Sequence, residues 1–358
     1  MIGPLIALCT AVAVVPLTIP VAHRLRAVAH SGPDRWSRRS VTTLGGIGIS
    51  AGLISGTVLA PLDVVNRLAI VAGVVVLVML GLRDDLSVVS PRTRLGVQAV
   101  VGIVFAAAVT SGHPAFLLAV PLAGLAVPLA VNATNMVDNA DALAATLSVV
   151  TATTLAGLAA AVVPSGDVSA LAWIIVASCL GFMAYNLPPA RVFMGDVGSL
   201  PLGFALAAAS ILLWRAATEV SGQTAAVVLF AIATAWAIQL GDVAMVFTTR
   251  LRRGKSPFRG GVDHTSHRLM RAGLSPGATV AFLALLAGGC GLVGFLAATT
   301  NNVLIAVMTM LGVAAGVAVF ESVLAIRTSH NNEPRSSNHG ARRAPRRSRG
   351  LLGLNRDS

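Results

Sequence analysis

The side chains best suited to chemistry lie between residues 132 and 143, in a polar stretch that separates two long apolar segments. Its polar members are Asn132, Asn135, Asp138, Asn139 and Asp141. If the stretch is helical, Asn132, Asn135, Asp138 and Asp141 recur every three residues and form one slowly rotating polar stripe. Carboxylates and carboxamides together suit a hard divalent cation and a phosphate-bearing substrate. In so apolar a chain they mark a polar site at a membrane boundary or in a cavity, unless they only cap helix ends.

Three further segments carry groups of the same kind. Asp84 and Asp85 close an apolar segment, and Asp196 lies between two glycines. The third segment, 254–269, contains four candidate groups: Lys255, His264, His267 and Arg268. Carboxylates, imidazoles and basic side chains are the ingredients of metal-assisted phosphate chemistry.

Each of these segments also has a purely structural explanation. The acidic pair at 84–85 would end a helix and bind a nearby arginine: Arg83, Arg92 or Arg94. Asp196 between glycines is also typical of a tight turn. His264 and His267 do not complete a zinc site, because no cysteine or third histidine is near them in the sequence. Their basic neighbours suit a diphosphate better, or form a solvated basic loop.

The elements that must position these groups are membrane helices. The chain has 358 residues, of which 55% are hydrophobic and only 11% charged, and its mean hydropathy is +0.81. Soluble proteins contain about 25% charged residues, so we expect an all-α integral membrane protein, a polytopic bundle of about eleven transmembrane helices. The expected spans are 3–22, 44–61, 66–82, 95–111, 115–132, 142–163, 168–187, 198–214, 223–243, 277–298 and 302–325.

Basic side chains alternate between the gaps that separate these spans. The odd-numbered gaps hold most of the arginines outside the C-terminal tail, and the even-numbered gaps are nearly bare. The positive-inside rule therefore places the odd gaps in the cytoplasm, the N-terminus outside and the C-terminus inside. Every polar motif described above falls in an odd gap, which predicts one site on the cytoplasmic face of the cell membrane. The net charge of +12 then reflects orientation and anionic lipid, and no nucleic-acid partner is expected.

Two regions differ in composition. Residues 1–327 form the expected transmembrane domain, and residues 328–358 are rich in Arg, Ser, Asn, Gly and Pro, which predicts a basic, disordered cytoplasmic tail. A polytopic transporter that uses membrane carboxylates is an alternative, but we find no internal repeat of the kind on which many transporters are built. Clustering of carboxylates at span ends on one face favours an enzyme.

In combination, the motifs resemble the polyprenyl-phosphate N-acetylhexosamine-1-phosphate transferase family, integral membrane enzymes of glycosyltransferase family 4 that start bacterial glycan assembly on a lipid carrier. The pair Asp84-Asp85 resembles the first acidic motif, and Asn132-x-x-Asn135-x-x-Asp138-x-x-Asp141 resembles the second. The third is matched by Asn186-x-Pro188-Pro189-Ala190-Arg191-x-Phe193-Met194-Gly195-Asp196-x-Gly198-Ser199. Gly254-Lys255-Ser256-Pro257-Phe258 and His264-x-x-His267-Arg268-Leu269 resemble the last cytoplasmic loop. The resemblance covers roughly residues 20–275 in the family's order.

Three positions depart from the family pattern. Asn139 and Ala142 replace the glycines of an Asp-Gly-x-Asp-Gly motif, and Ser266 stands where histidine is common. If a family glycine adopts positive φ, asparagine tolerates that conformation better than alanine does. The acidic groups are all present, so the departures bear more on the sugar than on the reaction. A catalytically inactive scaffold of the same fold is the other interpretation.

The resemblance implies transfer of a sugar 1-phosphate from a UDP-sugar to undecaprenyl or decaprenyl phosphate, with release of UMP. The branch that this chain resembles most transfers GlcNAc-1-phosphate. The implied polymer is arabinogalactan, teichoic acid, O-antigen or another envelope glycan, and a homodimer is compatible with the family.

The resemblance also assigns roles to residues. Mg²⁺, or Mn²⁺ in its place, is the implied cofactor, with Asp196 and Asn135 as ligands. Asp84 and Asp85 are the implied catalytic pair, which would orient or deprotonate the lipid phosphate; a covalent route with an aspartate nucleophile is the competing account. The implied substrate-binding residues are Asp138, Asp141, Asn186, Lys255, His264, His267 and Arg268.

Overall fold

The computed structural model describes residues 2–25, 27–29, 41–254, 256, 261 and 263–330, with side chains described as far as 324. These residues form thirteen helices and one short pair of strands. The elements in chain order are α1 (Ile2–Leu25), β1 (Val28–Ala29), β2 (Val41–Thr42), α2 (Gly46–Leu59), α3 (Val64–Leu86), α4 (Pro91–Val109), α5 (Phe116–Val137), α6 (Leu143–Ala161), α7 (Gly166–Asn186), α8 (Asp196–Val220), α9 (Gly222–Ala235), α10 (Ala237–Arg252), α11 (Thr265–Arg271), α12 (Pro276–Thr299) and α13 (Val303–His330).

The fold class is confirmed, because the chain is nearly all helical and apolar enough for several membrane crossings. Among the described residues, nine helices are long and apolar enough to span a membrane, or up to ten if the bent pair α9 and α10 is one span. The expected count of eleven is not confirmed. Helix α2 has 14 residues, which at 1.5 Å per residue is about 21 Å, less than the roughly 30 Å of hydrocarbon. The single span expected at 223–243 is instead broken at Trp236, where the chain bends by 64°.

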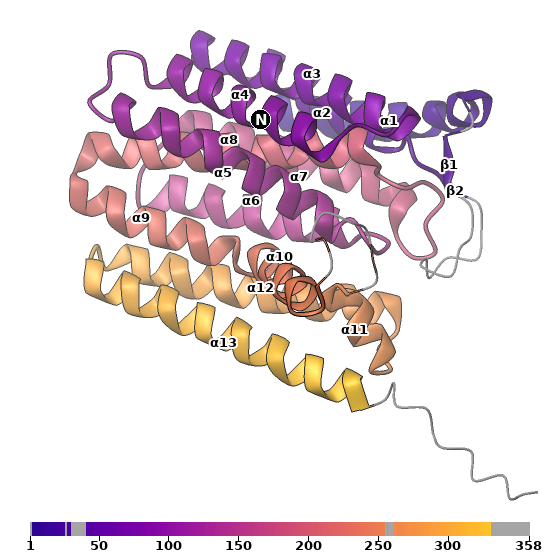
Figure 1. The fold of residues 1–358 in the computed structure, drawn as a ribbon. Helices are drawn as coiled ribbons and strands as arrows, with labels where there is room; N and C mark the ends of the chain where they lie inside the picture. The colour runs from indigo at the N-terminus through magenta and orange to yellow at the C-terminus, as the bar shows by residue number, and fades with distance from the viewer. Residues whose placement is uncertain are drawn as a thin grey trace, which may run out of the picture.

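Helix α8 lies at the centre of the bundle and carries Asp196 as its first residue. It is the most buried of the long helices, with 83% of its apolar window inside the protein, and it packs against α3, α5 and α9. Its approach to α2 is very close, because a Cβ on Gly46 would lie 2.3 Å from the Cα of Gly198. Figure 1 shows the long helices running side by side, with α11 at the end that carries β1 and β2.

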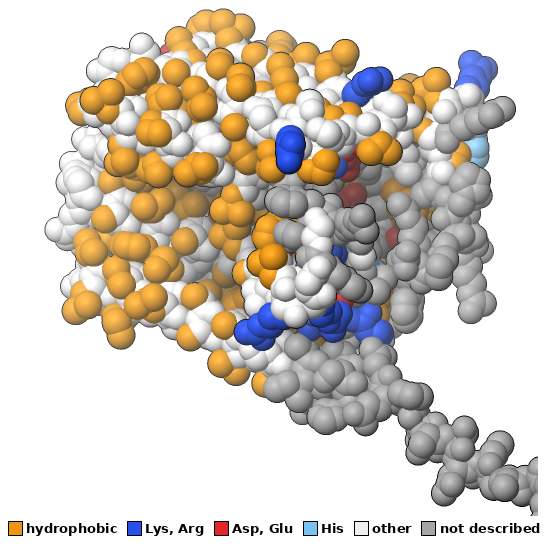
Figure 2. Space-filling model, viewed as in Figure 1, with side chains coloured by type: hydrophobic (Ala, Val, Ile, Leu, Met, Phe, Trp, Pro, Cys, Tyr) orange, Lys and Arg blue, Asp and Glu red, His pale blue; other side chains and the backbone are white. Residues whose placement is uncertain are grey.

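The surface matches a multi-pass membrane protein. Large apolar side chains are exposed along the outer helices, including Leu117 at 84% and Leu285 at 78%. Figure 2 shows that apolar side chains cover most of the visible face, whereas Lys and Arg gather at the end where β1 and α11 lie. This separation supports membrane embedding with a charged end outside the hydrocarbon. The orientation of that end toward the cytoplasm stays a prediction.

The expected tail lies almost entirely outside the described residues. Helix α13 continues to His330, three residues beyond the expected domain boundary at 327, and residues 331–358 are not described. Lys255 also lies outside the described residues.

A candidate active site at the end of the bundle

The N-terminus of α8 is held in place by a carboxylate from α3. Asp85 Oδ1 accepts a hydrogen bond from the Asp196 backbone N–H at 3.0 Å, and Oδ2 accepts one from Val197 N–H at 2.9 Å. These N–H groups have no partner within their own helix, so Asp85 caps α8 from 111 residues away. Gly195 precedes the helix with φ +66°, and a Cβ there would lie 2.2 Å from the Thr43 carbonyl oxygen. Asp85 and Gly195 therefore fix where the Asp196 side chain begins.

A short backbone pairing supports the same turn. Thr42 and Val192 form a parallel bridge, and Gly45 N–H and Gly46 N–H donate to the carbonyls of Phe193 and Met194 at 3.0 and 2.9 Å. The segment that leads to Asp196 is thereby bound to the start of α2.

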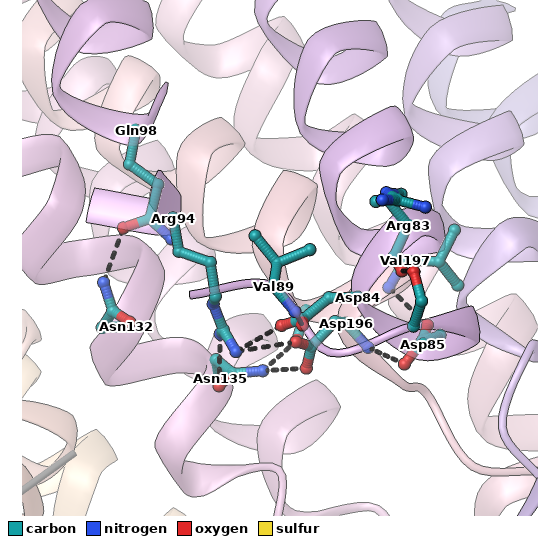
Figure 3. Close-up of polar contacts among 12 residues, drawn as sticks. Arg83, Asp84, Asp85, Val89, Arg94, Gln98, Asn132, Asn135, Asp196 and Val197 are labelled. Carbon is teal, nitrogen blue, oxygen red and sulfur yellow. Dashed lines mark hydrogen bonds and ion pairs between the residues drawn. The ribbon is translucent and has the colours of Figure 1, made fainter. Parts of the chain in front are cut away.

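Arg94 gathers three polar residues from other helices. Its Nη1 lies 2.5 Å from Asp84 Oδ2 and 3.1 Å from Asp196 Oδ2, and its Nη2 donates to Asn135 Oδ1 at 3.3 Å. Figure 3 shows the guanidinium of Arg94 between these side chains. Asn135 Nδ2 completes the network by donating to Asp196 Oδ1 at 2.6 Å and to Ser199 Oγ at 2.8 Å. Helices α3, α4, α5 and α8 thus bring Asp84, Arg94, Asn135 and Asp196 into one cluster.

This cluster fits a hard divalent cation. Oxygens of two carboxylates and one carboxamide converge on a single guanidinium, and Mg²⁺ is usually bound by one or two carboxylates together with substrate phosphates. A group of three or more His, Cys, Asp or Glu residues able to hold a metal does not occur among the described residues.

The polar stripe expected at 132–141 is only partly helical. Helix α5 ends at Val137, so the three-residue repeat is helical for Asn132 and Asn135 but not for Asp138 and Asp141. Asn132 points away from the cluster and donates to Gln98 Oε1 at 2.6 Å and to the Pro128 carbonyl at 2.7 Å. The chain leaves the helix because residues 138–142 form a turn that ends in a left-handed residue.

That turn is tied to the segment before Asp196. Asp141 Oδ2 accepts a hydrogen bond from Ala190 N–H at 2.9 Å. Asn186 Oδ1 accepts one from Ala142 N–H at 2.8 Å, and its Nδ2 donates to the Val192 carbonyl at 2.7 Å. In this structure both predicted substrate-binding side chains, Asp141 and Asn186, bind backbone and so hold the turn against the segment before Asp196. Ala142 has φ +63°, so it is the glycine position of the family at which positive φ is required; Asn139 is not among the positive-φ residues of the described chain.

Three of the predicted diphosphate-binding groups lie at or in α11: His264 directly precedes the helix, and His267 and Arg268 belong to it. His264, His267 and Arg268 are all buried, at 6%, 8% and 4% exposure. Arg268 Nε donates to the Asp263 carbonyl at 2.9 Å, and its Nη2 donates to Thr249 Oγ1 at 3.1 Å. Burial lowers the pKa of His267 to about 4, with a further contribution from His264 and Arg271, so His267 is neutral at pH 7. Burial also lowers the pKa of the Arg268 guanidinium from its usual value.

Two of the departures from the family pattern contact each other. Ser266 Oγ on α11 donates a hydrogen bond to Asn139 Oδ1, across 127 residues of sequence. Asn139 Nδ2 also donates to the Met136 carbonyl at 2.7 Å. The pair joins α11 to the turn that carries Asp138 and Asp141.

Two carboxylates at the opposite end of the bundle have a purely structural role. Asp63 caps α3 by accepting from Val65 N–H at 2.9 Å and Asn66 N–H at 3.2 Å. Asp167 accepts from Asn66 Nδ2 at 2.6 Å. Helix capping therefore explains these two carboxylates, whereas Arg94 links Asp84, Asn135 and Asp196 from three different helices.

Sequence reasoning missed three residues of this end of the bundle: Arg94, Asp242 and Glu321, the last within the expected span 302–325. Arg94 was interpreted as an orientation charge and as one of three partners for the acidic pair; its spacing of ten residues from Asp84, within one short gap, was the available signal. Asp242 was passed over inside the expected span 223–243. A carboxylate within a membrane span is by itself a signal of function.

Comparison with known proteins agrees with this geometry. The model of glycosyl transferase family 4 matches residues 67–214, which contain Asp84, Arg94, Asn135 and Asp196. A Bacillus subtilis protein assigned as an undecaprenyl-phosphate N-acetylglucosaminyl 1-phosphate transferase is 28% identical over 286 residues, covering 76% of this chain and 77% of its own length. A Streptomyces coelicolor protein assigned as a glycosyltransferase is 34% identical over 301 residues, covering 81% and 70%. The phospho-N-acetylmuramoyl-pentapeptide-transferase of Desulforudis audaxviator is 32% identical over 238 residues, covering 55% and 71%.

The long apolar helices define the class: a multi-pass membrane protein. Its polar cluster lies within residues 67–214, the region that the family model matches. The chain belongs to glycosyl transferase family 4.

Proposed function

We propose that the chain transfers a sugar 1-phosphate from a UDP-sugar to a polyprenyl phosphate, giving a polyprenyl-diphospho-sugar and UMP. The observation that carries the proposal is the cluster of Asp84, Arg94, Asn135 and Asp196, which four helices assemble at one end of a membrane bundle. A lipid acceptor is confined to the membrane and a nucleotide donor to water. A charged site at the ends of the spans is where the two substrates meet.

GlcNAc-1-phosphate is the group that we expect to be transferred. The Bacillus subtilis N-acetylglucosaminyl 1-phosphate transferase matches 76% of this chain, whereas the Desulforudis audaxviator phospho-N-acetylmuramoyl-pentapeptide-transferase matches 55%.

In the proposed reaction an oxygen of the lipid phosphate attacks the sugar-bearing phosphorus of the UDP-sugar. A new P–O bond forms to the lipid, the P–O bond to the UMP phosphate breaks, and UMP leaves with the electron pair. Since the second pKa of a phosphate monoester is near 6, the acceptor is largely dianionic at pH 7, and little general-base assistance is required. Asp84 would therefore orient the acceptor more than deprotonate it.

The geometry favours direct attack over a covalent aspartyl intermediate. Asp85 has both oxygens bound to backbone N–H groups, and Asp196 has both bound by Arg94 and Asn135. Asp84 Oδ1 accepts from Val89 N–H at 2.7 Å while Oδ2 binds Arg94. An aspartate nucleophile would have to give up one of these contacts. We assign Asp85 the positioning of Asp196.

Magnesium is part of the proposal. Asp84, Asp196 and Asn135 would hold it, and when bound it would neutralise charge that develops on the leaving phosphate. Arg94 would then be free to bind a substrate phosphate, for which a guanidinium is well suited. His264 and Arg268 would bind the diphosphate of the donor.

The test is transfer in membranes that contain the full-length protein. Radiolabelled UDP-GlcNAc, polyprenyl phosphate and Mg²⁺ should give lipid-linked label and an equal amount of UMP, and chelation by EDTA should stop the reaction. UDP-MurNAc-pentapeptide, assayed in parallel, tests the sugar. Absence of lipid-linked label with either donor would overturn the proposed activity.

A matched pair of variants tests the site. Asp196→Asn should abolish turnover, because it removes a charge at the centre of the cluster while keeping the side chain's size. Glu219→Gln makes the same chemical change on a side chain that is 51% exposed and pairs only with Arg215 in the described structure. It should leave turnover unchanged. Equal activity of the two variants would refute the assignment of Asp196.

A further inference from the structure

A second polar cluster joins α10, α11 and α13, and the proposed reaction does not account for it. Asp242 in α10 is 3% exposed and Glu321 in α13 is 7% exposed. Asp242 Oδ2 lies 2.8 Å from His264 Nδ1, and Oδ1 accepts from Thr265 N–H at 2.7 Å. Thr265 Oγ1 lies within hydrogen-bond distance of Asp242 Oδ1, at 2.8 Å, and of Glu321 Oε1. Burying carboxylates costs free energy, so a cluster of this kind indicates that the side chains have a function.

Asp242 determines which nitrogen of His264 is available to a ligand. Because Oδ2 of Asp242 is an acceptor, Nδ1 of His264 must carry a hydrogen and donate it. Nε2 has no hydrogen-bond partner among the described residues, and the side chain keeps 8% exposure. A hydrogen bond to one ring nitrogen sets the orientation of the ring. Nε2 of His264 is therefore the nitrogen left for a ligand.

The other oxygen of Asp242 orients α11, the helix that directly follows His264. Oδ1 accepts the N–H of Thr265, the first residue of α11, so Asp242 caps α11 as Asp85 caps α8. The same helix binds the Asp138–Asp141 turn through Ser266 and Asn139. One side chain thus fixes both the direction of α11 and the rotation of its first imidazole.

The number of hydrogens available for these contacts determines the protonation state of Glu321. A threonine hydroxyl has one hydrogen, yet Thr265 Oγ1 contacts two carboxyl groups, so one of these contacts requires a hydrogen from the carboxyl group. Asp242 already accepts from Thr265 N–H and from His264, which suits an anion. Glu321 Oε2 is buried without a partner among the described atoms, which suits a neutral acid that donates from Oε1 to Thr265.

From these contacts we propose that Asp242 is a positioning residue for the donor diphosphate. It holds His264 through Nδ1–H, and with the donor bound the ring is an imidazolium whose Nε2–H donates to a phosphate oxygen of the nucleotide. Neutral Glu321, through Thr265, holds Asp242. The phosphate contact rests on the proposed function; the hydrogen-bond arrangement does not.

The arrangement is tested without turnover. The full-length protein, labelled with ¹⁵N-histidine and placed in lipid nanodiscs, is studied by solid-state NMR, with His264→Gln identifying the His264 signals. Nδ1 of His264 should be protonated and hydrogen-bonded. An unprotonated Nδ1 in the wild-type protein would overturn the proposal, and that measurement requires no variant of Asp242.

Asp242→Asn supplies the perturbation. Its single amide oxygen is held by the two donors of Thr265, so the amide nitrogen faces His264, and Nδ1 must give up its hydrogen. We expect the Nδ1 signal to change to that of an unprotonated nitrogen. Glu321→Gln keeps a donor for Thr265 and should leave the His264 signals as in the wild type. An unchanged Nδ1 signal in Asp242→Asn, or a changed one in Glu321→Gln, would contradict the hydrogen counting.

Kinetics test the phosphate contact. Asp242→Asn should lower kcat/KM for UDP-GlcNAc about fivefold to tenfold, mainly through KM, because a neutral imidazole then donates from Nε2 to the phosphate and the contact loses the share that comes from the charge of the ring. Glu219→Gln is the control that should leave both constants unchanged. The expected NMR change with an unaltered KM would show that Asp242 orients His264 but that His264 does not bind the donor. An inactive wild-type protein with the expected NMR spectrum would refute the proposed function and the phosphate contact, but not the arrangement of Asp242, His264 and Glu321.

Discussion

The contact between Asn139 and Ser266 permits a quantitative test of how α11 is held against the acidic turn. Ser266 is 1% exposed and Asn139 is half-buried. Asn139→Ala would leave the Ser266 hydroxyl buried without this acceptor, at a cost of about 1–3 kcal/mol. Ser266→Ala would leave an Asn139 oxygen that water can reach, so only the net hydrogen bond of about 0.5–1.5 kcal/mol is lost. The two single variants should therefore differ, with Asn139→Ala the more harmful.

The double variant separates the contact from its surroundings. With both partners removed, no buried hydroxyl is left unpaired, and the two costs should fall short of additivity by about 1 kcal/mol. That coupling corresponds to about a fivefold factor in an equilibrium constant. The quantities to measure are KM for UDP-GlcNAc and the thermal unfolding of all four proteins in the same detergent.

Additive costs within about 0.3–0.5 kcal/mol would refute this reasoning, because residues that do not interact are additive to that extent. Coupling in stability with none in KM would show that the contact holds α11 but does not influence the donor site. Coupling in both would make these two departures from the family pattern one functional unit.

Three further predictions follow from individual contacts. Arg94→Ala should lower kcat/KM about tenfold to a hundredfold, since each hydrogen bond to a charged group contributes about 1.5–3 kcal/mol; UMP release measures this, with the exposed Arg92→Ala as control. Gly195→Ala should reduce both turnover and the unfolding temperature, because its Cβ would lie 2.2 Å from the Thr43 carbonyl oxygen. The control is Gly112→Ala, which is also at positive φ but has open space around it. It should cost only about 1–2 kcal/mol of backbone strain and leave activity unchanged. For His267 the pKa of about 4 in the folded protein lies below the unfolded value near 6.5. Between these pH values the unfolded state therefore binds more protons than the folded state. The free energy of unfolding should fall by at most about 3 kcal/mol as the pH falls from 6.5 to 4. His267→Gln should flatten that part of the curve of unfolding temperature against pH.

The sequence was sufficient to predict the class of fold and three of the four residues of the main cluster, all but Arg94. Hydropathy set the membrane helices within a few residues, because a span needs a long apolar run. Asp84, Asn135 and Asp196 could be grouped because each lies at the end of a span on the same side of an alternating charge pattern. Which of them touch could not be predicted, since that depends on the packing of α3, α4, α5 and α8.

The local backbone conformation of the acidic turn was the other feature that the sequence did not predict. The acidic stripe was expected to continue as a helix through Asp141, but the positive φ of Ala142 and the capping of the turn by Asn186 end the helix earlier. Alanine is tolerated at Ala142 because its strain of about 1–2 kcal/mol is partly offset by a smaller loss of backbone entropy on folding than glycine would have, about 0.4–1 kcal/mol. Its buried methyl group contributes about 0.8 kcal/mol more. The sequence showed that alanine replaces a family glycine at this position. That these effects nearly cancel could be recognised only from the backbone conformation.

The charge balance of the main cluster explains why Asp85 and Arg94 have such different roles. Three carboxylates, those of Asp84, Asp85 and Asp196, meet one guanidinium, and in the described contacts no second cation neutralises them. Asp85 needs no cation, because two backbone N–H groups and the positive end of the α8 dipole compensate its charge. Asp84 and Asp196 share Arg94, so a charge deficit falls on the two carboxylates that point into the cluster. That location of the deficit, more than the number of acidic residues, is the physical reason why we propose a divalent cation between Asp84 and Asp196, whose second positive charge would then attract a substrate phosphate.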